Sequence, residues 1–170
     1  MVNTGGMTQL LLPTGSCTLR TAVAEDLDPI LELLADDPIS ASRGDTANPG
    51  DRLAYERAFT AISADPAHQL LVATIDSEVV GTMQLTVIPG LARVGASRLQ
   101  IEAVRVRSNK RNLGLGAAMI RWAVDQAPEL GCTLVQLTSD AARVDAHRFY
   151  ERLGFTASHV GFKLSVPSAR

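Results

Sequence analysis

A strand-like run, Leu99 to Val106, is followed after a short basic loop by the sequence Arg111-Asn112-Leu113-Gly114-Leu115-Gly116. Apolar residues then recur at helical spacing, which predicts a helix that begins at the glycines. The first N–H groups of a helix lack partners within it, and the helix dipole favours negative charge there. Glycines let an anion approach these N–H groups closely. This stretch therefore predicts a binding site for phosphate groups.

The charge around this glycine turn is strongly basic but local. Between Arg98 and Arg121 there are six basic residues and a single acid, Glu102, whereas the whole chain has a net charge of −2. A small anionic ligand suits this pattern better than a nucleic acid does. A dinucleotide-binding turn would need a third glycine where Met119 stands, and a P-loop would need Lys in place of Ala117.

The turn resembles the coenzyme A pyrophosphate motif Arg-x-x-Gly-x-Gly of the GCN5-related N-acetyltransferase (GNAT) family. A second motif, Ala-x-x-Phe-Tyr-x-x-x-Gly-Phe, resembles the closing signature of that family at Ala146 to Phe155. The resemblance covers about Thr18 to Leu164. It is nearest to bacterial members with the segment that Ser139 to Tyr150 reproduces, although the commonest form has Asn where this chain has Arg143.

The resemblance implies that acetyl-CoA is the cosubstrate, that no metal is required, and that a small-molecule or protein amine attacks the thioester directly in a ternary complex. The backbone N–H of Val104 or Val106 would polarise the thioester carbonyl, and Val106 would also pair with the pantetheine arm. The remaining cofactor-binding candidates are Arg107, Lys110, Arg111, Asn112, Leu113, Gly114, Leu115, Gly116, Ala117 and Arg143. For the basic side chains among them, a solvated charged turn is the alternative.

The proposed catalytic groups are Tyr150 as the general acid that protonates the leaving thiolate and Glu102 as the base, acting directly or through water. Tyr150 matches the position of the family's tyrosine, with packing beside the pantetheine as the alternative. Glu102 is expected to be partly desolvated, with a raised pKa. Its alternative is a surface glutamate paired with an arginine.

Two further polar residues near the second motif have competing interpretations. Ser139 would either serve the thiolate or cap the last helix. His147 would be either a base or a solvated or structurally bonded histidine. Acids at positions 25, 26, 28, 36 and 37 would suit a cationic acceptor or form a solvated helix face.

The periodicity predicts an α/β (α+β) fold, with a mixed, twisted sheet and helices on both faces. The resemblance implies that this is the GNAT fold, with six to seven strands. Helices are expected at 24–35, 52–63, 114–127 and 142–153, and strands at 17–22, 69–75, 79–87, 99–106, 133–138, 155–156 and 160–166. In the strand before the glycine turn, the apolar phase changes between Ala103 and Val104. Burial of both faces or a β-bulge would explain the change, and a bulge would open a cleft.

The chain is interpreted as one acetyltransferase domain at residues 17–170 after a poorly ordered extension at 1–16. The loop from Ile39 to Asp51 is either a substrate-facing lid or a plain connection. Cys17 and Cys132 lack metal spacing and are expected to be free thiols. With no apolar run of membrane-spanning length and no basic residue before Arg20, a cytoplasmic location and no membrane partner are expected. Strand exchange at the C-terminal edge would allow a homodimer.

Three functions are therefore compared. The first is an acetyl-CoA-dependent N-acetyltransferase acting on a primary amine. The second is a CoA-binding regulatory or partner protein on the same fold that lacks turnover. The third, nucleic-acid binding through the basic turn, predicts affinity for any polyanion that falls steeply with salt. The sequence does not identify the amine.

Overall fold

The computed structural model describes residues 6–37 and 48–166. Between Leu137 and Thr138 the chain divides into two compact units, and each is described by itself. Most of the loop considered as a lid lies at residues 38–47, outside the described residues.

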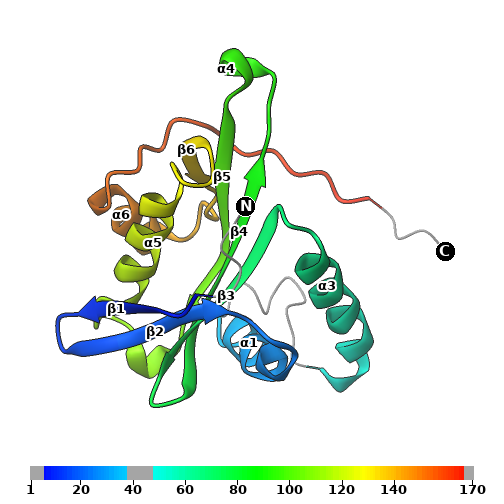
Figure 1. Cartoon of the computed structure of the whole chain (residues 1–170), viewed down its shortest axis with the longest axis vertical. Helices are drawn as coiled ribbons and strands as arrows, with labels where there is room; N and C mark the ends of the chain where they lie inside the picture. Colours follow the sequence, from blue (N-terminus) through cyan, green and yellow to red (C-terminus); the bar gives the residue numbers. More distant parts are fainter. Residues whose placement is uncertain (1–5, 38–47, 167–170) are drawn as a thin grey trace. The chain divides into compact units, whose positions relative to one another are not determined.

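The first unit is built on a six-stranded sheet whose strands follow one another in chain order (Figure 1). The strands are β1 (Thr8–Leu12), β2 (Gly15–Thr21), β3 (His68–Ile75), β4 (Glu78–Ile88), β5 (Ser97–Val106) and β6 (Cys132–Leu137). Neighbouring strands are antiparallel except β5 and β6, which are parallel and connected through a helix. A tight turn suffices between antiparallel strands, whereas parallel strands need a long crossover. The predicted mixed α/β fold is confirmed.

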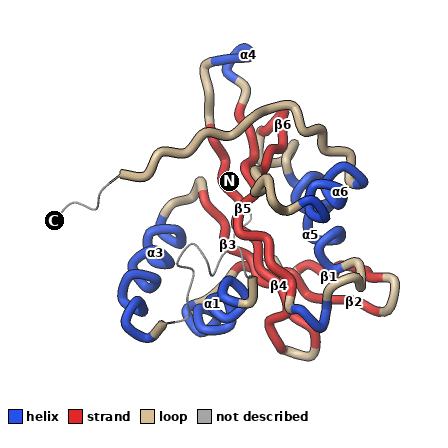
Figure 2. The backbone as a smooth tube through the Cα atoms, turned by 180° about the vertical axis from the view of Figure 1, so that it is seen from behind, coloured by secondary structure: helices blue, strands red, loops and turns tan. Residues whose placement is uncertain are grey.

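Helices cover both faces of this sheet. The helices α1 (Leu27–Ala35) and α3 (Arg52–Ala64) lie on one face, and α5 (Leu115–Gln126) lies on the other (Figures 1 and 2). A 3₁₀ turn, Ala24–Asp26, precedes α1, and the short α4 (Ala92–Gly95) forms the tip of the β4–β5 hairpin. Within the described ranges, no helix has the length and apolar character needed to cross a membrane.

The core under α1 and α3 is apolar. Ile30 and Leu33 of α1 pack with Val72 and Val79 of the sheet, and Phe59 of α3 packs against them. Each such side chain contributes roughly 2 kcal/mol when it leaves water. This packing fixes the two helices over β3 and β4.

On the opposite face, α5 approaches the sheet closely at Gly81. A Cβ atom on Gly81 would lie 3.2 Å from the Sδ atom of Met119. Met119 and Leu115 of α5 are buried, as are Leu99 and Ile101 of β5. The predicted helix after the glycine turn is confirmed, and its buried side chains hold the turn against β5.

The N-terminal segment differs from the sequence-based expectation. Residues 8–12 form β1, which pairs with β2 through a turn at Pro13 and Thr14. The prediction of a poorly ordered extension at residues 1–16 is therefore wrong from Thr8 onward. The run Leu10-Leu11-Leu12 lacks alternation, but its backbone pairs along the whole length of β2.

Both cysteines are buried in the first unit. Cys17 is 2% exposed and Cys132 is 5% exposed, and neither forms a disulfide. Burial raises the pKa of both thiols, because a thiolate is poorly solvated in an apolar interior. The prediction of free thiols is confirmed.

The second unit contains α6 (Val144–Arg152), as predicted, followed by a segment without regular structure. Residues 155–166 contain no strand, so the strands predicted at 155–156 and 160–166 are wrong. Their alternating apolar side chains are largely exposed: Val160 80%, Phe162 94%, Leu164 89% and Val166 79%. Alternation sets which way side chains point, but a strand also requires a neighbouring backbone to pair with.

Candidate functional site

Strand β5 contains a β-bulge at the position that the sequence predicts. Thr82 pairs with Arg105 and Gln84 pairs with Glu102, so Ala103 and Val104 together lie opposite one residue of β4. Ala103 has a φ of 51°, a left-handed conformation that is rare for a residue other than glycine. The bulge is confirmed, and it explains the change of apolar phase along the strand.

Beyond this point, among the residues that the structure describes, β5 pairs with β4 alone. Its parallel pairing with β6 ends at Ile101 and Leu137, whereas β5 itself continues to Val106. The candidate backbone donors Val104 and Val106 both lie in the part of β5 that has left β6. An extended ligand could pair with β5 along this edge as a further strand would.

The glycine turn follows directly. Asn112 has a φ of 62° and Gly114 a φ of 84°, and α5 begins at Leu115. The first backbone hydrogen bond of the helix runs from the Ala118 N–H to the Gly114 carbonyl at 2.9 Å. The N–H groups of the residues before Ala118 precede this ladder and face the space at the helix start. Strand, turn and helix start thus follow one another as predicted, and anion binding at this cradle stays a prediction.

The β1–β2 turn packs against this cradle. A Cβ atom on residue 114 would lie 2.8 Å from the Cδ atom of Pro13, closer than real Cβ contacts. Gly114 is therefore required both by its left-handed backbone and by the close approach of Pro13. Sequence analysis missed this contact, although Pro13-Thr14-Gly15 is a turn signal between two apolar runs.

Arg111, the first residue of the motif, connects the turn to two other elements. Its Nε–H donates to the Val106 carbonyl at 3.1 Å, and its Nη2 lies 3.3 Å from an Asp36 carboxylate oxygen at the end of α1. Arg111 thereby holds the turn against the end of β5.

The neighbouring arginines also contact carboxylates. Arg107 donates to the Val79 carbonyl and lies 3.1 Å from Glu78 and 3.7 Å from Glu32. Its guanidinium is thus engaged by β4 and α1, a role that was not predicted for this phosphate-binding candidate. Lys110, by contrast, is a half-buried residue at the end of the short 3₁₀ turn before Arg111.

The acids around α1 are mostly ion-paired. Arginines lie within 4.0 Å of Asp26, Asp28, Asp36 and Asp37, through Arg20, Arg52, Arg111 and Arg105 respectively. Asp26 and Asp37 are buried, so a solvated helix face does not describe them, whereas the Asp28 and Asp36 side chains are 68% and 42% exposed. Three of the paired arginines come from β2, β5 and the glycine turn.

Glu102, the candidate base, is exposed next to the bulge. The expectation that it is partly desolvated is therefore wrong. It lies opposite Gln84 of β4, just past the last residue of β5 that pairs with β6. Its side chain is accessible to water.

Tyr150 and Arg143, the remaining candidates, belong to the second unit. The Tyr150 ring makes edge-on contacts with Phe149, at 5.2 Å between centroids, and with Phe155, at 6.0 Å. Tyr150 is half-buried, as is Arg143 just before α6. Within this unit, the ring of Tyr150 is held by aromatic packing.

The start of α6 resolves two alternatives. Asp140 accepts a hydrogen bond from the Ala142 N–H at 2.8 Å, and its carbonyl lies 2.8 Å from the His147 Nε2. His147 is thus structurally bonded. The Ser139 Oγ is buried without a hydrogen-bond partner among the described residues, so helix capping by Ser139 is wrong.

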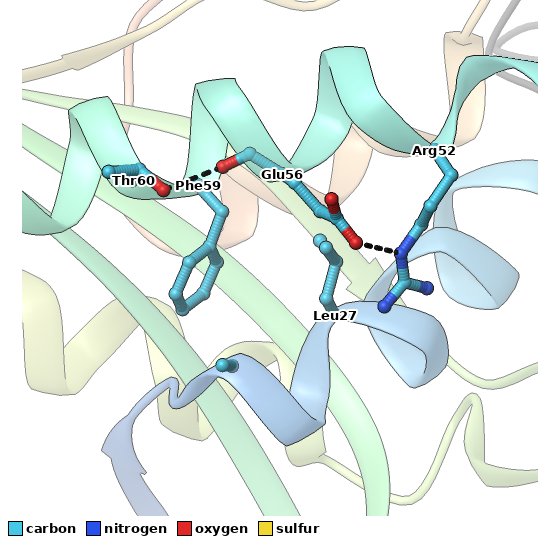
Figure 3. Close-up of a pocket in the computed structure, with 6 residues that line it drawn as sticks. Leu27, Arg52, Glu56, Phe59 and Thr60 are labelled. Atoms are coloured by element: carbon cyan, nitrogen blue, oxygen red, sulfur yellow. Dashed lines mark hydrogen bonds and ion pairs between the residues drawn. The ribbon is translucent and has the colours of Figure 1, made fainter.

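A cavity of about 190 Å³ lies between α1 and α3 (Figure 3). Its lining consists of Ala24, Leu27, Arg52, Glu56, Phe59 and Thr60. Arg52 and Glu56 are hydrogen-bonded to each other at 2.8 Å along its edge, and the Phe59 ring points down from α3. None of the predicted site residues lines this cavity, so it is separate from the cradle on β5 and α5.

The chain that carries this bulge, separating strand and glycine turn is similar to known proteins. A family model described as the acetyltransferase (GNAT) family matches residues 27–155. The chain belongs to the GNAT family. The matched residues begin at α1 and include strands β3 to β6, the glycine turn and the motif on α6.

Relatives and solved structures agree with this GNAT assignment. The aminoalkylphosphonate N-acetyltransferase of Salmonella typhimurium is 30% identical over 146 residues, which cover 86% of this chain and 89% of the relative. A Bacillus halodurans structure described as a transcriptional regulator is 41% identical, with a TM-score of 0.84, over 88% of this chain and 99% of that one. An acetyltransferase structure from Trypanosoma brucei is 26% identical, with a TM-score of 0.72, over 88% and 99%.

Proposed function

We propose that the protein is an N-acetyltransferase that transfers the acetyl group of acetyl-CoA to a primary amine. The observation that carries this proposal is the course of β5. The strand leaves β6 after Ile101, bulges at Ala103 and Val104, and leads directly into a glycine turn at a helix start. An extended arm pairing with β5 would bring its terminal phosphates to the turn and its thioester to the bulge.

The residues of the turn fit coenzyme A. N–H groups between Arg111 and Ala117 would hold the pyrophosphate, because those from Asn112 onward precede the first helical hydrogen bond and no Cβ at Gly114 or Gly116 obstructs them. The Arg111 N–H donates to the Ser108 carbonyl at 3.3 Å and would have to release it. Val106 would pair with the pantetheine arm, with Arg143 as a further contact. Lys110 is the side-chain candidate for the outer phosphates, whereas Arg107 would have to exchange its present carboxylate partners.

Three groups of the chain would each perform one part of the reaction. The backbone N–H of Val104 or Val106 would donate to the thioester oxygen as charge develops there. Glu102 would accept a proton from the amine, directly or through water, so that its lone pair can attack the carbonyl carbon. As the C–N bond forms and the C–S bond breaks, the Tyr150 hydroxyl would protonate the leaving thiolate.

The second candidate is a CoA-binding regulatory protein without turnover. It is supported by the Bacillus halodurans structure at 41% identity, which is described as a transcriptional regulator. The relative from Salmonella typhimurium, whose name specifies aminoalkylphosphonates, supports the enzyme. Small primary amines, aminoalkylphosphonates among them, are therefore the first acceptors to examine.

The deciding experiment measures release of free CoA from acetyl-CoA over a panel of primary amines. Wild-type protein should turn over at least one amine, and Tyr150→Phe should lower kcat about 100-fold without weakening acetyl-CoA binding. Tyr55→Phe on α3 is the matched control, since Tyr55 is the other tyrosine of the chain. Binding of acetyl-CoA without turnover of any amine would favour the regulatory protein instead.

A further inference from the structure

The sheet face beneath α1 and α3 is apolar on β3 and polar on the strands that follow. Under the helices, on β3, it carries the apolar Leu70 and Val72. On the strands toward β6 it carries a set of polar side chains that we call the polar row. The polar row consists of Gln84 and Thr86 of β4, Arg98, Gln100 and Glu102 of β5, and Gln136 of β6.

The strand register places these side chains on one face. Successive side chains of a strand alternate between faces, so Arg98, Gln100 and Glu102 share a face of β5. Residues paired across neighbouring strands also share a face. Thr86 pairs with Gln100, and Gln100 pairs in turn with Gln136. The buried Leu99 and Ile101 occupy the opposite face, on the α5 side.

The middle of the polar row is fixed and uncharged. The Gln136 Nε2 donates to the Gln100 Oε1 at 2.6 Å, and Gln100 is only 7% exposed. Nearby, Thr86 is hydrogen-bonded to His68 of β3 at 2.9 Å. A buried amide pair of this kind holds its geometry, because losing a partner would leave a polar group unsatisfied.

Arg98, at one end of the polar row, has no carboxylate within 4.0 Å among the described residues, and its buried Nε–H has no hydrogen-bond partner. The other arginines that surround the site each have one. Arg20, Arg52, Arg105, Arg107 and Arg111 all lie within 4.0 Å of an acid. A partly buried guanidinium without an anion is costly, so a ligand anion would be stabilised there.

Glu102, at the other end, lies beside the bulge where the amine would react. Arg98 lies four positions earlier on the same strand, which places the two Cα atoms roughly 13 Å apart. The row thus has a carboxylate near the reaction point, a hydrogen-bonded amide pair in the middle and a cation at the far end. This order of charges is complementary to an acceptor with an ammonium group at one end and an acid at the other.

We propose that Arg98 selects acceptors that carry an anionic group remote from the reacting amine, a carboxylate, phosphate or phosphonate. The inference rests on the proposed acetyl transfer and adds the chemical class of its acceptor. The Arg98 Nη1 would lie 3.8 Å from a Cβ atom on Gly90, which follows Ile88, the β4 partner of Arg98. The guanidinium therefore points away from Glu102, so the acid of the acceptor must be remote from its amine. The guanidinium fork binds planar or tetrahedral oxyanions through paired N–H groups.

The test compares matched acceptors of increasing chain length: ω-amino carboxylates, ω-aminoalkyl phosphonates, and alkylamines of the same number of carbons. The acidic acceptors should have a kcat/KM about 10- to 100-fold above that of the neutral amine at the best length. The two acidic series distinguish carboxylate from phosphonate. Arg98→Gln should remove this preference by raising KM for the acidic acceptor, and Arg98→Lys should retain part of it.

Arg93→Gln is the matched control, since Arg93 lies exposed on the same β4–β5 hairpin and outside the polar row. It should keep the wild-type preference. Acetylation of neutral and acidic amines at equal efficiency, or an unchanged preference in Arg98→Gln, would overturn the inference while leaving the acetyltransferase intact. If no amine of any class were acetylated, the proposed function itself would fail.

Discussion

The guanidinium of Arg111 lies 3.3 Å from the carboxylate of Asp36, 75 residues earlier in the chain, while its Nε–H donates to the carbonyl of Val106. The first residue of the glycine-turn motif therefore joins the turn to the end of β5 and to the end of α1. Both charged side chains are partly exposed, and such pairs contribute less than about 1 kcal/mol to stability. The contact matters chiefly for the position of the turn.

The contacts of Arg111 depend on the planar shape of its guanidinium as well as on its charge. We expect Arg111→Lys to bind acetyl-CoA about tenfold more weakly than wild type, nearly as weakly as Arg111→Gln. The planar guanidinium bonds a carbonyl and a carboxylate together, which a compact ammonium cannot do in the same geometry. Isothermal titration calorimetry gives the affinities, with Arg121→Lys on the exposed side of α5 as the control. Wild-type affinity in Arg111→Lys would show that charge alone suffices.

Gly114 is the second position at which the turn depends on local geometry. We expect Gly114→Ala to lower the free energy of unfolding by about 1–3 kcal/mol, because an alanine is strained at a φ of 84°. Its Cβ would also lie 2.8 Å from Pro13, so the turn must shift and acetyl-CoA binding should weaken. Urea unfolding and calorimetric titration measure the two effects.

Gly131→Ala is a matched control for Gly114→Ala. Gly131 also has a positive φ, 69°, but no atom lies within 4 Å of the Cβ that the substitution would add. It should lose stability through backbone strain and keep its affinity for acetyl-CoA. Equal affinity in both variants would mean that the Pro13 contact does not shape the phosphate site.

Local patterns of the sequence were enough to predict much of the site. The change of apolar phase between Ala103 and Val104 indicated a bulge as one of two explanations, because an inserted residue shifts a period of two. The glycine turn and α5 follow from spacing in a single short segment. Each of these features is determined by neighbours along the chain.

Features that depend on distant partners were not predicted. Nothing in local periodicity couples Asp36 to Arg111 or Pro13 to Gly114, because these contacts exist only after the sheet has formed. The same limitation explains β1, whose strand character depends on pairing with β2. It also explains residues 160–166, which alternate as a strand would but have no strand structure.

The ion pair between Asp26 and Arg20 predicts a pH dependence of stability. Burial by itself raises the pKa of Asp26, but hydrogen bonds from Arg20 and the Val23 N–H, together with the charge of Arg20, outweigh it and lower the pKa. The hydrogen bond to Asp26 correspondingly raises the pKa of Arg20. A lowered carboxyl pKa stabilises the fold above the ordinary value of about 4, and this contribution is lost as pH falls through the lowered pKa.

We therefore expect Asp26→Asn to lower the free energy of unfolding at neutral pH by about 2 kcal/mol, since it breaks a pair with one buried partner. The difference from wild type should shrink as the pH falls below about 4. Urea unfolding across this pH range measures it. Asp145→Asn, which removes a fully exposed carboxylate 3.6 Å from Arg148, should change nothing measurable. A difference in Asp26→Asn that grows toward low pH would contradict the assignment.

Glu102 offers a test of how the amine loses its proton. We expect Glu102→Gln to reduce kcat/KM about 100-fold at neutral pH, where the acceptor is mostly an ammonium ion that needs a base. The deficit should shrink as the pH rises toward the pKa of the amine, because more acceptor then arrives already deprotonated. Affinity for acetyl-CoA should not change, and Glu129→Gln, an exposed glutamate just beyond α5, is the control. A deficit that is constant with pH would instead show that Glu102 binds the acceptor without accepting its proton.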